Sequence, residues 1–153
     1  MDVGSKGSYP ANALSNFSPH KFVIDGIECS SMEGFLQSLK YSNQDMQKEV
    51  CKLIGFAAKR KGANKNWKEK QILYWQGQEL KRSSEEYQQL LVRAYKAMAE
   101  QSEGFKNALK ASGDAVYSHS MGKNKESETV LTEREFCRLL NMCRDLVKEN
   151  LSK

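Results

Sequence analysis

The sequence predicts an α+β fold that is predominantly α-helical. Ser/Thr-x-x-Glu helix-start signals precede apolar runs with helical spacing, one Asp-Gly pair separates two short β-type runs, and no repeat or linker divides the chain. A chain of 153 residues, 39% of them hydrophobic, is long enough to bury one core. We therefore expect a flexible N-terminal segment, rich in Gly, Ser and Asn, over residues 1–13 and a single domain over residues 14–153.

A β-hairpin is expected first. The runs 22–24 and 27–29 contain Val and Ile, and they flank the pair Asp25-Gly26. This dipeptide accepts the left-handed backbone of a two-residue hairpin turn, so the two runs should pair as antiparallel strands.

The first helix should follow the hairpin directly. Ser30 and Glu33 have the spacing of a capping box. Glu33, Gln37 and Lys40 form one stripe of the expected helix, which is either a solvated edge or the wall of a cleft. The apolar residues on the neighbouring arc should face inward; they are Met32, Phe35, Leu36 and Leu39.

The second helix should begin after Asn43 and end near Gly55. Its inward residues should be Met46, Val50, Leu53 and Ile54. Residues 59–70, called the basic segment below, then carry six Lys or Arg and one acidic residue, Glu69. The net charge of +5 is mild, but this local cluster is either a solvated surface or a site for phosphates of a nucleotide or nucleic acid.

Helix-start signals also mark the C-terminal half of the chain. They predict three helices, with a short strand and a polar loop between the last two. The start signals are Ser83 with Glu86, Ser102, and Thr132 with Glu135; the strand covers residues 115–119 and the loop residues 121–128.

Several classes of site are excluded by the motifs that the sequence lacks. It has no Gly-x-x-x-x-Gly-Lys loop, no Gly-x-Gly-x-x-Gly, no nucleophile elbow and only two His. Its four Cys show neither a CxxC nor a zinc-ligand spacing, which indicates reduced thiols. We expect no metal, no cofactor and, without a signal peptide or a membrane-spanning apolar run, no membrane partner and a cytoplasmic location. Carboxylates, amides, lysines and aromatics remain, and they suit cleavage of a glycosidic bond.

Five stretches of the chain together carry a family resemblance. They are Leu14-Ser15-Asn16-Phe17, Ser31-x-Glu33-x-x-x-Gln37-x-x-Lys40, Tyr74-Trp75-x-Gly77, the segment from Gly113 to Gly122, and the segment from Glu128 to Phe136. In this order they resemble the NADAR family, also called the YbiA-like family, over nearly the whole chain. The resemblance implies a compact, mostly helical α+β domain of the YbiA-like kind, with short strands, tied to NAD and ADP-ribose chemistry.

The resemblance also implies an activity. Some family members are N-glycosidases that act on phosphorylated intermediates of riboflavin synthesis, and others remove ADP-ribose from modified guanine in nucleic acid. We therefore expect an N-glycosidase that hydrolyses an N-linked ribose. Its partner would be an ADP-ribose-containing or ribosyl-phosphate substrate, or nucleic acid that carries ADP-ribosylated guanine. Two alternatives stay open: a non-catalytic module that holds ADP-ribose or NAD, and a nucleic-acid-binding protein that uses the basic segment.

Two positions depart from the family pattern. Gly34 follows Glu33 where many members have His. The segment from Ser118 to Gly122 stands where many members have Asp-x-Tyr-Trp-Gly, so the roles of that Asp and Trp must fall to other residues.

The catalytic candidates are Glu33, Lys40 and His119. Glu33 would activate water or stabilise the cation-like sugar, although helix capping explains it equally, and a helix N-terminus favours its ionised form. Lys40 would bind phosphate or attack the sugar; Glu33 on the same stripe would raise the pKa of Lys40, which favours the phosphate role. His119 would protonate the departing base or bind phosphate, or it is structural.

The substrate-binding candidates begin with two residues before the hairpin and an amide on the first helix. One of the aromatics Tyr74 and Trp75 would stack on the ligand. A loop and the start of the last helix would bind a diphosphate. Turn formation, core packing and helix capping explain several of them equally well. In full they are Asn16, Phe17, Gln37, Tyr74, Trp75, Gly122, Lys123, Thr132 and Glu133.

Overall fold

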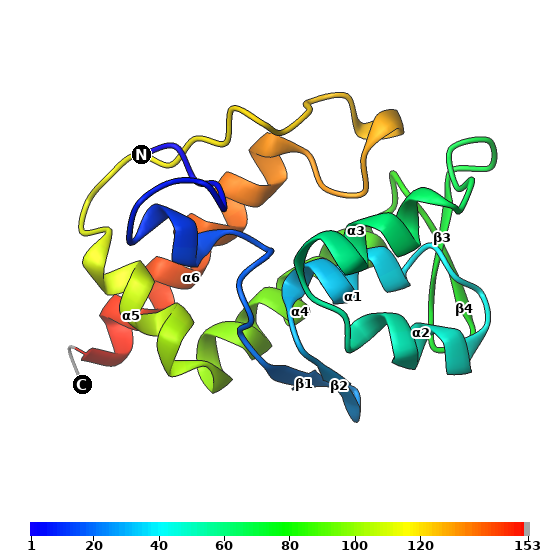
Figure 1. Ribbon diagram of the computed structural model, residues 1–153, viewed down its shortest axis with the longest axis horizontal. Coiled ribbons are helices and arrows are strands. Elements are labelled where there is room, and N and C mark those ends of the chain that lie inside the picture. Colours follow the sequence, from blue (N-terminus) through cyan, green and yellow to red (C-terminus); the bar gives the residue numbers. More distant parts are fainter. Residues whose placement is uncertain (152–153) are drawn as a thin grey trace.

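The computed structural model describes residues 1–151 and confirms an α+β fold dominated by helices. In chain order the elements are η1 (Ala11–Leu14), β1 (Phe22–Ile24), β2 (Ile27–Cys29), α1 (Met32–Ser38), α2 (Gln44–Cys51), α3 (Gly55–Ala63), β3 (Ile72–Trp75), β4 (Gln78–Lys81), α4 (Glu85–Gln101), α5 (Glu103–Ala111), η2 (Glu126–Glu128) and α6 (Glu133–Leu151). In Figure 1, α4 crosses the middle of the molecule, with α5 and α6 on one side and α1 to α3 on the other. One core cluster of buried residues joins the two sides.

The β1–β2 hairpin is confirmed. Asp25 and Gly26 both have positive φ, 49° and 77°, which is the backbone that a two-residue turn of the expected type requires. The turn is anchored by the Asp25 carboxylate, which accepts the indole N–H of Trp75 at 2.8 Å and pairs with Arg93 at 2.9 Å. The hydrogen bond from Arg93, and to a smaller extent the one from Trp75, lowers the pKa of Asp25.

Helix α1 begins one residue later than expected. Its N-cap is Ser31, whose hydroxyl accepts the Gly34 N–H at 3.0 Å, whereas the Ser30 N–H donates to the Cys51 carbonyl at 2.9 Å. The predicted Ser30–Glu33 capping box is therefore wrong, and the Glu33 side chain is not needed as a cap. The predicted apolar arc is confirmed, since all four of its members are buried.

The segment after α2 differs from the prediction. Asn43 caps α2 as expected, accepting the Met46 N–H at 2.9 Å, but the helix ends at Cys51. Gly55 does not end it; with φ of +57° it turns the chain into a separate helix, α3. Ile54, expected to face inward, is exposed. The basic segment consequently begins on a helix, with Arg60 in its last turn.

A second hairpin, β3–β4, was not predicted. Gln76 and Gly77 form its turn with φ of 48° and 85°, the same geometry as at Asp25-Gly26. The Tyr74 N–H donates to the Leu39 carbonyl at 2.8 Å, and the Trp75 ring packs edge-on against Phe35 with centroids 5.0 Å apart. The hairpin thereby supports the end of α1.

The C-terminal half agrees with the prediction in part. Ser102 caps α5, and Thr132 and Glu135 form a complete capping box: Thr132 N–H to Glu135 at 2.7 Å and Glu135 N–H to Thr132 at 3.1 Å. The cap of α4 is Ser84, one residue after the predicted Ser83. The predicted strand over residues 115–119 is reduced to one parallel bridge, between Ser118 and Asp2.

That bridge ties the N-terminal segment to the domain. Residues 1–13 contain little regular structure, but Val3 is buried and its N–H donates to the Ser118 carbonyl at 2.8 Å. Separately, no helix within residues 1–151 is long and apolar enough to cross a membrane.

Candidate functional site

Glu33 occupies the first turn of α1 and is half-buried. Its backbone N–H donates to the Asn16 carbonyl at 3.0 Å, and its carboxylate accepts the side-chain amide of Gln37 at 2.9 Å. The Asn16 side chain in turn accepts the hydroxyl of Tyr95, a buried residue of α4, at 2.6 Å. The core thus fixes the loop before the hairpin against the carboxylate. Two of the predicted binding residues, Asn16 and Gln37, contact Glu33 directly.

Burial raises the pKa of Glu33. The Gln37 hydrogen bond and the charges of Lys40, Lys59 and His119 oppose that shift without cancelling it. The helix N-terminus alone favours an ionised carboxylate, so the direction differs from the prediction because desolvation is the larger effect. A carboxyl group with a raised pKa exchanges protons more readily near neutral pH, which suits acid–base chemistry.

Lys40 was expected on the same helix as Glu33, but α1 ends at Ser38, so Lys40 lies in the turn that follows the helix, where it is half-buried. Burial lowers the pKa of Lys40; Glu33 opposes this effect and Lys68 adds to it. We expected Glu33 to determine the direction, but desolvation outweighs it. A lowered pKa increases the fraction of neutral amine, so the structure keeps both the phosphate-binding and the nucleophilic role open.

Gln37 is buried, with 7% of its surface exposed, rather than facing solvent. Its Oε1 has no hydrogen-bond partner within residues 1–151 and lies against Gly62 of α3, where a β-carbon would overlap it. Gly62 therefore allows α3 to approach α1 closely. In this arrangement the Gln37 amide positions Glu33.

His119 is held by backbone contacts on two sides. Its Nδ1 lies 2.6 Å from the Val3 carbonyl and therefore carries the proton in the neutral ring. Its backbone N–H donates to the Glu133 carboxylate at 2.9 Å. The ring packs edge-on against Phe136. Among the described residues no hydrogen bond occupies Nε2, so this nitrogen is available to a ligand.

The loop that follows His119 packs against it and is hydrogen-bonded to its backbone. The Gly122 N–H bonds the His119 carbonyl at 2.9 Å, and a β-carbon at Gly122 would lie 2.7 Å from the His119 ring. The Glu133 N–H donates to the Lys123 carbonyl at 2.8 Å. Thr132 and Glu135 form the capping box. The backbone N–H groups of Thr132, Glu133 and Glu135 at the start of α6 are therefore already hydrogen-bonded within the protein. Of the predicted diphosphate loop, the exposed Lys123 side chain is the part that remains free for an anion.

The predicted aromatic candidates separate into two groups. Trp75 is a buried core residue bonded to Asp25, and Tyr74 lies half-exposed on the opposite face of β3. Phe17, by contrast, is next to Asn16 and packs edge-on against Phe56 with ring centroids 5.1 Å apart.

Sequence reasoning missed four residues of this neighbourhood. Phe56 and Lys59 belong to α3, which was not predicted, and Lys68 belongs to the basic segment that follows it. Tyr95 lies on the buried face of α4 and was not among the candidates. The basic segment was the available signal, because the charges of Lys59 and Lys68 act on Glu33 and Lys40 respectively.

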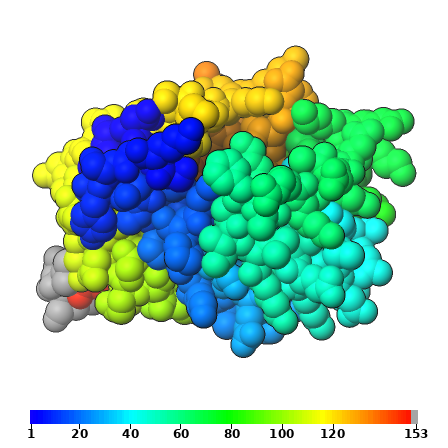
Figure 2. Space-filling view, in the orientation of Figure 1, coloured from blue at the N-terminus to red at the C-terminus, as the bar shows by residue number. Residues whose placement is uncertain are grey.

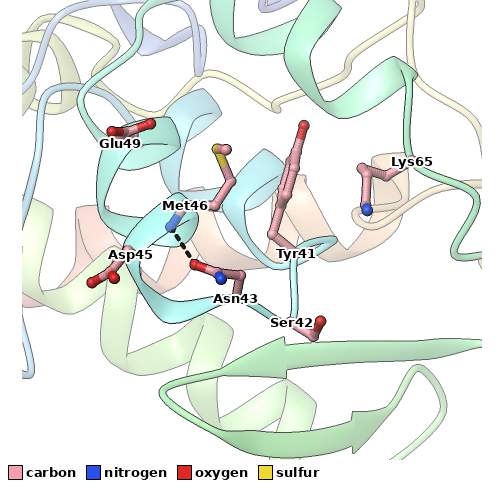
Figure 3. A pocket seen from close by; sticks show the side chains of 7 residues that line it. All are labelled: Tyr41, Ser42, Asn43, Asp45, Met46, Glu49 and Lys65. Atoms are coloured by element: carbon pink, nitrogen blue, oxygen red, sulfur yellow. Dashed lines mark hydrogen bonds between the residues drawn. The ribbon is translucent and has the colours of Figure 1, made fainter.

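Two pockets lie away from Glu33. An open pocket of about 400 Å³ is lined by residues of the α1–α2 connection and of α2 and by Lys65, whose ammonium lies 5.1 Å from the Tyr41 ring centroid (Figure 3). A second, of about 280 Å³, lies between the β1–β2 turn, α2 and Trp75. Within residues 1–151 no group of three or more His, Cys, Asp or Glu could hold a metal ion.

Gly34 explains one departure from the family pattern. A β-carbon there would lie 2.6, 2.8 and 2.9 Å from the carbonyl oxygens of Leu53, Cys51 and Val50. These are backbone atoms that cannot rotate away, so the close contact between α1 and the end of α2 excludes a larger residue.

Gly34→Ala is therefore expected to lower the free energy of unfolding by about 1–3 kcal/mol through overpacking. Urea unfolding monitored by circular dichroism measures this. Gly4→Ala is the matched control, because a β-carbon at Gly4 meets no atom within 4 Å. Equal stability of the two variants would contradict the packing argument.

Comparisons with known proteins agree with this architecture. The solved NMR structure of YbiA from E. coli superposes with a TM-score of 0.64 over 100% of this chain and 88% of that chain, at 17% identity, which confirms the YbiA-like fold. A relative from Enterobacteria phage T4, described as an uncharacterized 17.1 kDa protein in the Gp30-rIII intergenic region, is 37% identical over 147 residues, 95% of this chain and 97% of its own. The family model described as bacteriophage protein GP30.3 matches residues 8–145. The chain therefore belongs to the bacteriophage GP30.3 protein family and has the YbiA-like fold that its motifs predicted.

Proposed function

We propose that the protein is an N-glycosidase that hydrolyses the bond between a ribose and a nitrogen base. One observation supports it most: a half-buried carboxyl group, Glu33, lies within the electrostatic reach of Lys40, Lys59 and His119. A carboxylate with lysine charges acting on it suits a substrate that is anionic overall but develops positive charge at the sugar during bond cleavage.

The roles follow from the chemistry of that step. Water attacks the anomeric carbon as the bond to the base nitrogen breaks. Glu33, ionised, accepts the proton of the attacking water and stabilises the cation-like sugar. His119, oriented by the bond from its Nδ1 to the Val3 carbonyl, acts in the form protonated on both ring nitrogens and gives its Nε2 proton to the departing nitrogen. Lys40, Lys59 and Lys68 neutralise phosphate groups.

Two substrates follow from the family resemblance: ADP-ribosylated guanine in nucleic acid and a phosphorylated intermediate of riboflavin synthesis. The test incubates the purified protein with each and detects released sugar phosphate by mass spectrometry. Absence of release from both at high enzyme concentration would refute the proposal for these substrates. Binding of ADP-ribose without release would favour a non-catalytic binding module.

The nucleic-acid alternative rests on the basic segment. Its cationic side chains are exposed, and Lys59 and Lys68 lie near the proposed site rather than on a separate face. Strongly salt-dependent DNA binding without any small-molecule binding would favour this alternative.

Lys40→Arg separates two mechanisms. If Lys40 only binds phosphate, the variant should retain much of the activity, because Arg also binds phosphate. If Lys40 attacks the sugar, the variant should be inactive, since a guanidinium stays protonated. Borohydride reduction during turnover, followed by mass spectrometry, tests the same point directly. A sugar adduct on Lys40 would establish the covalent route; its absence together with an active Lys40→Arg would establish direct attack by water.

A further inference from the structure

An exposed aromatic pair borders the candidate site. Phe56, the second residue of α3, has 58% of its surface exposed. Its ring meets that of Phe17 edge-on, with centroids 5.1 Å apart and planes at 78°. In such a pair one ring edge contacts the other ring face, so much of the exposed ring stays uncovered. The exposed Ile54 and the side-chain-free Gly55 extend the apolar surface.

Backbone contacts place this pair beside Glu33. Phe17 follows Asn16, whose carbonyl accepts the Glu33 N–H. Lys59 lies three residues after Phe56, which places the two side chains on one face of α3. Lys59 in turn acts electrostatically on Glu33. In Figure 2 the blue N-terminal loop and the blue-green α3 meet at the surface in the middle of this face.

The surroundings indicate the chemistry of the occupant. Lys40, Lys59 and Lys68 favour anionic groups, whereas the surface of the pair is apolar and flat. A ligand with phosphates at one end and a planar ring at the other matches both parts. Exposure alone does not mark such a site: Val116 is 83% exposed, yet it is not among the groups of the described chain that act on Glu33.

We propose that Phe56, supported edge-on by Phe17, is the platform on which the planar nitrogen heterocycle of the substrate stacks. The proposal rests on the proposed N-glycosidase function and adds a residue that favours ligands with a planar base over ribose phosphates that lack one. The heterocycle would lie against the Phe56 ring while the ribose reaches Glu33 and the phosphates face the lysines. Stacking on an aromatic ring tolerates different bases, because every base has a π-face.

Calorimetric titration with three probes tests the platform. AMP and GMP carry a base, whereas ribose 5-phosphate shares their sugar and phosphate without one. The wild type should bind the two nucleotides more tightly than ribose 5-phosphate. Phe56→Ala should weaken nucleotide binding by about 5- to 150-fold and leave ribose 5-phosphate binding within about twofold. Phe56→Trp should bind the nucleotides about as tightly as the wild type, because it keeps an aromatic ring. Val116→Ala, an exposed apolar control, should also behave as the wild type.

Each outcome decides the question. A wild type without preference for the nucleotides, or a Phe56→Ala variant that weakens all three probes equally or none, overturns the platform. The glycosidase function is judged separately, by release of sugar phosphate. Base-dependent binding that needs Phe56, without any release, would uphold the platform and refute hydrolysis.

Discussion

Glu33→Gln is expected to reduce the rate of product formation by about 10²–10⁴-fold, the usual contribution of a positioned acid–base group. The amide can neither accept a proton from water nor stabilise a cation with full charge. Substrate affinity should change little, because the proposed contacts to the phosphates and the base come from other residues. Rapid-quench measurement of sugar release and calorimetric binding of a ribose phosphate give the two quantities.

The structure indicates that Glu33→Gln removes the charge of this side chain without disturbing the fold. Glu33 does not cap α1, since Ser31 does, and Gln at position 33 can still accept the Gln37 amide through its carbonyl oxygen. Unfolding free energy should therefore stay within about 0.5 kcal/mol of the wild type. Glu28→Gln, at an exposed glutamate on β2, is the matched control. Full activity of a well-folded Glu33→Gln would remove the residue from catalysis.

The same carboxyl group should shape the dependence of activity on pH. Because burial raises the pKa of Glu33, the ionised form is lost at a higher pH than for an exposed glutamate. A base must be ionised, so the rate should fall as the pH falls through that raised pKa. This acidic limb should lie above the ordinary glutamate range and should be absent from the residual rate of Glu33→Gln.

The helix starts show how far local sequence signals reach. Capping boxes were predicted at Ser30 and Ser83, and in both cases the neighbouring serine is the cap. Each prediction lay within a Ser-Ser pair, and spacing alone does not choose between adjacent hydroxyls. Thr132 has no such competitor, and there the predicted box is complete. Local signals therefore located these helix starts to within one residue, whereas only the structure shows that Glu33 does not cap α1.

The candidate site joins residues that are far apart in the sequence, and the spacing of residues along one helix or strand does not predict such contacts. Asn16 and Glu33 could be associated through the family motif, and Gln37 through its helical position. The charge of His119 acts on Glu33, although the two residues are 86 positions apart in the sequence. Helix α3 was missed because Gly55 is typical of a helix end, yet here it begins one. Phe56 and Lys59 were lost with it.

Arg82→Met is expected to lower the free energy of unfolding by about 3–5 kcal/mol, the largest stability effect that the structure predicts. Arg82 has 1% of its surface exposed and forms a forked pair with Glu135, at 2.6 and 3.1 Å. It also donates to the Thr129 carbonyl at 2.9 Å, so one guanidinium joins the end of β4 to the start of α6. Urea unfolding at neutral pH measures the loss, and Arg134→Met, at an exposed arginine of α6, is the control.

The pH dependence distinguishes loss of charge pairing from loss of packing. Burial alone would raise the pKa of Glu135, but hydrogen bonds from Arg82, the Thr132 N–H and Gln88 together lower it. The pair therefore stabilises the wild type above the unfolded-state pKa of Glu, near 4.5, and this contribution is lost as the pH falls through the lower folded-state pKa. In Arg82→Met the carboxylate stays buried without its main partner, and protonation relieves that cost. The difference in unfolding free energy between wild type and Arg82→Met should thus shrink between neutral pH and about pH 4. A difference that is constant over this range would show that Arg82 acts through packing against Tyr87, over whose ring its guanidinium lies at 5.1 Å, and not through its charge.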